Sequence, residues 1–202
     1  MCGDCGDYAC CNNECICGES KFVLSAVSSV VGMLFLGILA ILYAIFRLDI
    51  VWNLTGVVYG PSYDFMILCV SGILALSGII ALKAGDLTEG LLFALVGFFA
   101  FIAAADTLFF GYGGVFWIMD WLLFLLLMVI VMLLFSSKDR TFAFAVALFA
   151  IGTLVLIAFG GTSGDFAPMV AGIMFLLAGL IFLYVAISDW LFVETGADLP
   201  IV

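Results

Sequence analysis

Phe116 to Phe135 reads FWIMDWLLFLLLMVIVMLLF, an apolar run that only Asp120 interrupts. A helix that crosses a bilayer needs about 20 apolar residues, so this run is long enough to span. Five more such runs lie at Phe22–Phe46, Phe65–Leu82, Gly90–Phe110, Phe142–Gly160 and Pro168–Ser188. In lipid each run must satisfy its own backbone hydrogen bonds, which selects the helix. We therefore expect an all-α, polytopic membrane protein with six transmembrane helices.

The composition leaves little outside the bilayer. Of 202 residues, 67% are hydrophobic and 10% are charged. We expect a cysteine-rich acidic tail at 1–21, a six-helix transmembrane domain at 22–190 and a short tail at 191–202. The connections are too short for an extramembrane catalytic domain, and we expect no enzyme because the chain has no histidine, no nucleophile–base pair and no phosphate loop. It also has no basic cluster that could hold nucleic acid.

The few cations predict the orientation. Lys and Arg accumulate on the cytoplasmic side of a membrane. If the helices alternate, Lys21, Lys83, Lys138 and Arg140 share one side and only Arg47 lies on the other. We therefore expect a multi-pass protein of the cell membrane with both termini in the cytoplasm. Four of these cations, Arg47, Lys83, Lys138 and Arg140, are expected at helix ends, so none of them is expected to hold an anion within the membrane.

Three segments carry a resemblance to a known family. Ser77–Asp86 reads SGIIALKAGD, Phe93–Phe99 reads FALVGFF, and Thr195–Pro200 reads TGADLP. Their order and spacing resemble the acetate/succinate transporter family of small six-helix membrane proteins. The family's Asn-Pro motif in the first helix is missing here, where Lys21–Val27 reads KFVLSAV. The acid-resistance membrane proteins, also built from Gly-rich apolar helix pairs, are a second family that the chain resembles.

The first resemblance implies a channel or transporter for small monocarboxylates such as acetate. It also implies a homo-oligomeric ring, commonly a hexamer, in which each protomer has its own narrow path. The path would be constricted at Phe93, Val96 and Phe99, where Val96 replaces the family's usual tyrosine, and Ser71 and Ser77 would supply polar groups. The alternative is a structural or interaction subunit of a larger membrane assembly, with the cysteine tail as its metal-binding element.

Two acidic residues lie inside the predicted spans. Asp106 and Asp120 are each about one turn inside the outer end of consecutive helices. A carboxylate in hydrocarbon is costly, so each should face water, a partner or a cavity. Three interpretations remain open: interfacial acids that reach outer water, an outer vestibule or proton-linked gate, and a cation site.

Glycines recur inside the same spans, among them Gly32, Gly37, Gly78, Gly97 and Gly179. Small residues let helix backbones approach closely in a membrane. The sequence leaves two roles open for them, plain helix packing or the lining of a narrow pore.

Six of the seven cysteines precede the first helix: Cys2, Cys5, Cys10, Cys11, Cys15 and Cys17. In a cytoplasmic tail disulfides are disfavoured, and four thiolates suffice for Zn²⁺ or an iron–sulfur cluster. The spacing matches no standard ligand frame, so a redox tail, a lipidated tail and a disordered tail without a site remain alternatives.

Overall fold

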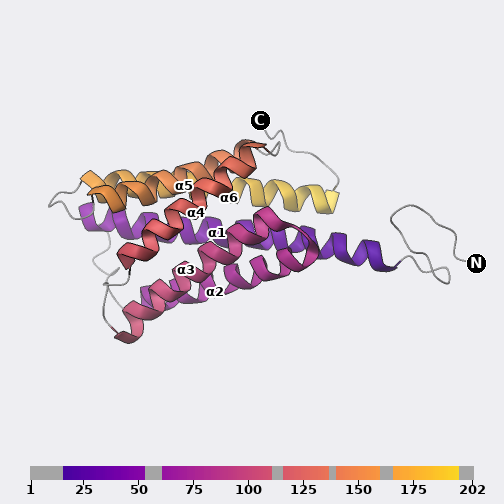
Figure 1. Cartoon of the computed structure of the whole chain (residues 1–202), viewed down its shortest axis with the longest axis horizontal. Coiled ribbons are helices and arrows are strands. Elements are labelled where there is room, and N and C mark those ends of the chain that lie inside the picture. Colours follow the sequence, from indigo (N-terminus) through magenta and orange to yellow (C-terminus); the bar gives the residue numbers. More distant parts are fainter. Residues whose placement is uncertain (1–15, 53–60, 111–115, 137–139, 160–165, 196–202) are drawn as a thin grey trace, which may run out of the picture.

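The protein is described by a computed structural model that covers residues 16–52, 61–110, 116–136, 140–159 and 166–195. Within these ranges every element is a helix and none is a strand, which confirms the all-α prediction. The six helices are α1 (Ile16–Trp52), α2 (Pro61–Ala84), α3 (Leu87–Phe110), α4 (Phe116–Ser136), α5 (Arg140–Phe159) and α6 (Phe166–Thr195) (Figure 1).

Five of these helices contain a stretch long and apolar enough to cross a membrane, namely all except α4. The described apolar stretch of α4 is shorter and runs from Trp121 to Phe135. By length and composition the helices are consistent with a multi-pass membrane protein. α1 begins before the predicted Phe22, and α6 continues past the predicted Ser188. Helical hydrogen bonding continues beyond the apolar run, so hydropathy alone places the start of α1 too late and the end of α6 too early in the chain.

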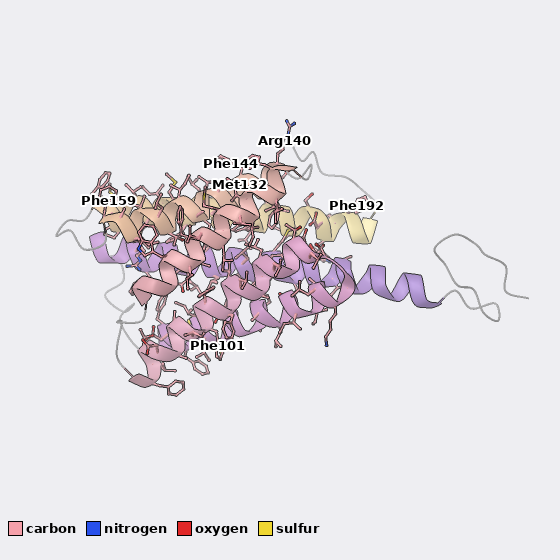
Figure 2. The ribbon with its side chains drawn as sticks, viewed as in Figure 1. Phe101, Met132, Arg140, Phe144, Phe159 and Phe192 are labelled. Carbon is pink, nitrogen blue, oxygen red and sulfur yellow. The ribbon has the colours of Figure 1, made fainter. Side chains whose placement is uncertain are left out.

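The outer surface of the bundle is apolar. Figure 2 shows Phe101, Met132, Phe144 and Phe192 projecting from the outside of the helices, and all four side chains are exposed. A continuous apolar exterior of this kind is unusual for a protein that lives in water. It fits a bundle that is surrounded by lipid.

The helices pack in the ring order α3, α2, α1, α6, α5, α4, and α4 makes a smaller contact back to α3. The most extensive contacts are between α2 and α3 and between α1 and α6. Figure 1 shows the helices running roughly along the same axis, with α1 between the α2–α3 pair and the helices α5 and α6. The short connections make successive helices antiparallel.

The connection between α2 and α3 is a tight turn. Gly85 has a positive φ of 102°, a conformation that glycine adopts without steric cost. The Gly85 N–H donates to the Leu82 carbonyl at 3.2 Å, and the Asp86 N–H donates to the Ala81 carbonyl at 3.0 Å. These two bonds form a Schellman motif that ends α2. The Asp86 carbonyl then accepts from the Gly90 N–H at 3.1 Å as α3 begins.

Glycine allows both of the extensive helix contacts. A Cβ atom added at Gly78 of α2 would lie 2.2 Å from the backbone nitrogen of Ala94 in α3, and one added at Gly97 of α3 would lie 2.5 Å from the backbone nitrogen of Ala75. Between α1 and α6, a Cβ at Gly37 or at Gly179 would lie about 3 Å from the other's carbonyl oxygen. These glycines therefore serve close backbone packing, which was the first of the two roles that the sequence left open.

Replacing Gly78 with Ala tests this packing directly. The new methyl group would meet the backbone of α3, which cannot move aside as a flexible side chain can, so we expect a loss of about 1–3 kcal/mol in the free energy of unfolding. The matched control is Gly72→Ala in the same helix, where the nearest atoms belong to the Phe101 ring at 3.7 Å. Unfolding of the purified protein in mixed detergent measures both variants. Equal stability of the two would contradict the packing account.

Candidate functional site

A cavity of about 510 Å³ lies inside the bundle, and all six helices contribute to its lining. The lining comes from the C-terminal parts of α1, α3 and α5 and from the N-terminal parts of α2, α4 and α6. Because the helices are antiparallel, these parts meet at one end of the bundle. The main contributors are Tyr43, Phe46 and Arg47 of α1, Tyr63 and Asp64 of α2, Val96, Phe99, Asp106 and Thr107 of α3, Leu123 of α4, Phe149 and Thr153 of α5, and Phe175 of α6.

The cavity occupies one half of the bundle, and packed side chains of the described residues close it toward the other half. On α3 the lining runs from Val96, near the middle of the helix, to Thr107. Phe93, which precedes it, is completely buried, and a Cβ atom at Gly32 of α1 would lie 2.3 Å from its ring. Nearer the closed end the Ser29 hydroxyl donates to Glu89 Oε2 at 2.5 Å, joining α1 to α3. The cavity therefore ends close to the middle of the helices.

Aromatic rings form part of the cavity wall. The Phe46 and Tyr63 rings are stacked with centroids 5.1 Å apart, and the Phe149 and Phe175 rings are tilted with centroids 5.0 Å apart. Gly152 of α5 leaves room for Phe175, because a Cβ atom there would lie 2.8 Å from the Phe175 ring. This part of the wall is thus apolar and fixed by ring contacts between helices.

Three hydroxyl groups that line the cavity already donate their protons to backbone carbonyls. The Tyr63 hydroxyl donates to the Leu42 carbonyl at 2.8 Å, the Thr153 hydroxyl to the Phe149 carbonyl at 3.0 Å, and the Thr107 hydroxyl to the Ala104 carbonyl at 3.0 Å. A hydroxyl oxygen that has donated its proton can still accept. These three groups therefore offer a ligand acceptors rather than donors.

Arg47 brings a positive charge into the cavity lining. Its guanidinium carbon lies 5.3 Å from the centroid of the Phe46 ring, within the range of a cation–π contact. Gly172 of α6 lets the stem of Arg47 come close, since a Cβ atom there would lie 3.3 Å from the Arg47 Cβ. Arg47 lies at the end of the apolar stretch of α1, which runs from Ala26 to Leu48, while the helix itself continues to Trp52. Trp52, whose indole ring favours the membrane interface, marks the last turn of this helix.

Asp64 and Asp106 bring negative charge to the same cavity. Asp64 lies in the first turn of α2, where the helix dipole favours a carboxylate. Asp106 lies about one turn before the end of α3. Its Oδ2 atom is buried and accepts no hydrogen bond from any residue that the structure describes. A buried carboxylate oxygen without a donor is unfavourable, so Asp106 is a candidate to bind a ligand.

The structure brings some of the predicted site residues together and separates others. Val96, Phe99 and Asp106 line the cavity, whereas Phe93 is packed beyond its inner end. Ser71 and Ser77 are buried and donate to the Leu68 and Leu74 carbonyls of their own helix at 3.1 and 2.8 Å. Neither serine lines the cavity.

Two of the predicted sites cannot be placed. The side chain of Asp120 lies outside the described residues, and so do the side chains of the six tail cysteines Cys2, Cys5, Cys10, Cys11, Cys15 and Cys17. Cys69, the remaining cysteine, is exposed on α2.

Comparison of the chain with models of protein families, with curated proteins and with solved structures finds no match.

The contact between Tyr63 and α1 yields a stability prediction. Tyr63→Phe removes the hydrogen bond to the Leu42 carbonyl but keeps the ring stacked on Phe46, so we expect a loss of about 1 kcal/mol in the free energy of unfolding. Tyr63→Leu removes both interactions and should cost more, by about another 1 kcal/mol. Thermal unfolding in detergent measures the series. A Tyr63→Leu variant as stable as the native chain would show that this wall does not hold α1 to α2.

Proposed function

We propose that the chain is a membrane channel or transporter for small monocarboxylates such as acetate, and that the cavity is its substrate site. The observation that carries the proposal is the presence of Arg47 in a cavity that all six helices surround. A guanidinium presents a planar fork of N–H donors that matches the two oxygens of a carboxylate. Acetate itself is the substrate that the sequence resemblance implies.

The size and walls of the cavity support the same proposal. A volume of about 510 Å³ is typical of small-molecule sites, which are mostly apolar with a few placed polar groups. Apolar and aromatic walls suit the hydrocarbon part of a carboxylate, while Arg47 suits its charged end. A site that ends near the middle of the membrane is typical of transporters that open to one side at a time.

The closed half of the bundle supplies the barrier in this proposal. Val96 lies at the inner end of the cavity and Phe93 fills the space next to Gly32. A solute that continued toward the far end would have to displace the Phe93 ring and separate α1 from α3. Phe93, Val96 and Phe99 are therefore the residues that we assign to the constriction.

We further propose that all six helices span the membrane with both termini in the cytoplasm, so that the cavity faces the outside. Lys83 and Arg140 support this orientation, because both are exposed at the end of the bundle opposite the cavity. Figure 2 shows Arg140 pointing away from the helices. The exposed apolar exterior has room for contacts with further copies of the chain, and we propose a homo-oligomeric ring with one path per protomer.

Uptake of labelled acetate into proteoliposomes tests the function. We expect the native chain to exceed protein-free vesicles and Arg47→Gln to lower the protein-dependent uptake by about tenfold to a hundredfold, the range for losing a charged hydrogen-bonding partner. Arg140→Gln is the matched control, since Arg140 is an exposed cation at the opposite end, and its uptake should be unchanged. Native uptake no greater than that of protein-free vesicles would contradict the proposal, as would equal uptake by the two variants.

A further inference from the structure

We propose that the preferred substrate of the cavity is a zwitterionic amino acid, with its carboxylate toward Arg47 and its ammonium group toward Asp106. An amino acid is a monocarboxylate that also carries a positive charge. The inference therefore rests on the proposed transport function and narrows its substrate class. Four features of the cavity support it: the balance of charge, the position of Asp106, the excess of acceptors and the space along α3.

The first feature is the balance of charge among the residues that line the cavity. The described lining holds one guanidinium, that of Arg47, and two carboxylates, those of Asp64 and Asp106. However these three groups pair, one cation can neutralise only one carboxylate, so the lining keeps an excess of negative charge. An uncompensated charge in an apolar cavity is unfavourable. A ligand with only a carboxylate would add to the excess, whereas a ligand with an ammonium group brings a countercharge.

The helix dipoles decide which carboxylate needs that countercharge. Asp64 is in the first turn of α2, where the positive end of the dipole already stabilises it. Asp106 is near the C-terminal end of α3, where the dipole is negative and favours cations. Its buried Oδ2 accepts no hydrogen bond within the described part of the chain. Asp106 is therefore the natural partner of an ammonium group.

The hydrogen-bonding groups of the cavity also favour a ligand with an ammonium group. The hydroxyl groups of Tyr63, Thr107 and Thr153 have given their protons to backbone carbonyls, so they face a ligand as acceptors. Together with the two carboxylates they make the cavity rich in acceptors. An ammonium group has three N–H donors to offer them. Arg47 has five N–H donors, so it can bind a ligand carboxylate beside any partner within the protein.

The wall of α3 leaves space for such a ligand. Between Phe99 and Asp106 its lining residues include Ala100, Ala103 and Ala104, whose side chains are small. The rings of Phe149 and Phe175 lie on other helices and offer an apolar surface for a short aliphatic side chain. A small amino acid such as alanine has a carboxylate for Arg47, an ammonium group for Asp106 and a methyl group for the apolar rings.

Competition in proteoliposomes that contain the native chain tests the inference without any mutation. The measured quantity is exchange of labelled alanine, challenged with excess alanine, propionate or ethylamine. Propionate is alanine without its ammonium group, and ethylamine is alanine without its carboxylate. We expect alanine to compete best and each half-analogue to compete at least about tenfold more weakly, because each leaves one charged partner unmet.

Substitution of Asp106 assigns the ammonium site. We expect Asp106→Asn to lower alanine exchange by about tenfold or more while keeping acetate uptake, because acetate needs only Arg47. Asp106→Glu should keep part of the alanine exchange. Asp86→Asn, the same chemical change in the turn between α2 and α3 at the closed end, should leave both solutes unaffected.

The outcomes separate this inference from the transport function. Acetate uptake without alanine exchange would overturn the amino acid assignment and leave the transport function standing. An equal loss of both solutes in Asp106→Asn would also overturn it. Propionate competing as well as alanine would do the same, and this result does not depend on how the variants fold. If neither solute exceeded protein-free vesicles, both proposals would fail.

Discussion

Helices in a bilayer gain nothing by hiding apolar surface from lipid, so close contact between backbones is the constraint on which this bundle depends. The chain meets it with glycine between α2 and α3, at Gly78 and Gly97, and between α1 and α6, at Gly37 and Gly179. α4 contains no glycine, and its contact with α3 is small. Two tight helix pairs and a looser partner leave space between them at one end, which is where the cavity lies.

Helices α1 and α3 each run through both the half of the bundle that holds the cavity and the closed half. α1 carries Ser29 and Gly32 in the closed half and Arg47 in the cavity, while α3 carries Glu89 and Phe93 in the closed half and Asp106 in the cavity. The direct contact between α1 and α3 is among the smallest between helices in the described part of the bundle. A ligand that bridges Arg47 and Asp106 would thus link the two helices that close the opposite end.

Hydropathy was sufficient to predict the helices but not to predict which residues line the cavity. Six apolar runs predicted six helices because each run must satisfy its own backbone in lipid. The inward faces could not be predicted, because helices that are apolar on all sides have no polar face to mark the outside. Ser71 and Ser77 illustrate this limit, since both were assigned to the path and neither lines the cavity. The apolar run of α1 stops beside Arg47, and the helix continues for one more turn to Trp52.

The central claim is that water reaches the cavity from only one end of the bundle. The accessibility of single cysteines along α3 tests this claim most directly. In a chain whose native cysteines are replaced by serine, single cysteines at Val96, Phe99 and Thr107 would face the cavity, and cysteines at Phe98 and Phe101 would face lipid. The account predicts that a membrane-impermeant thiol reagent reaches the three cavity positions from one side of the membrane and leaves the two lipid-facing positions unmodified. Modification from both sides, or equal modification of the two sets, would contradict it.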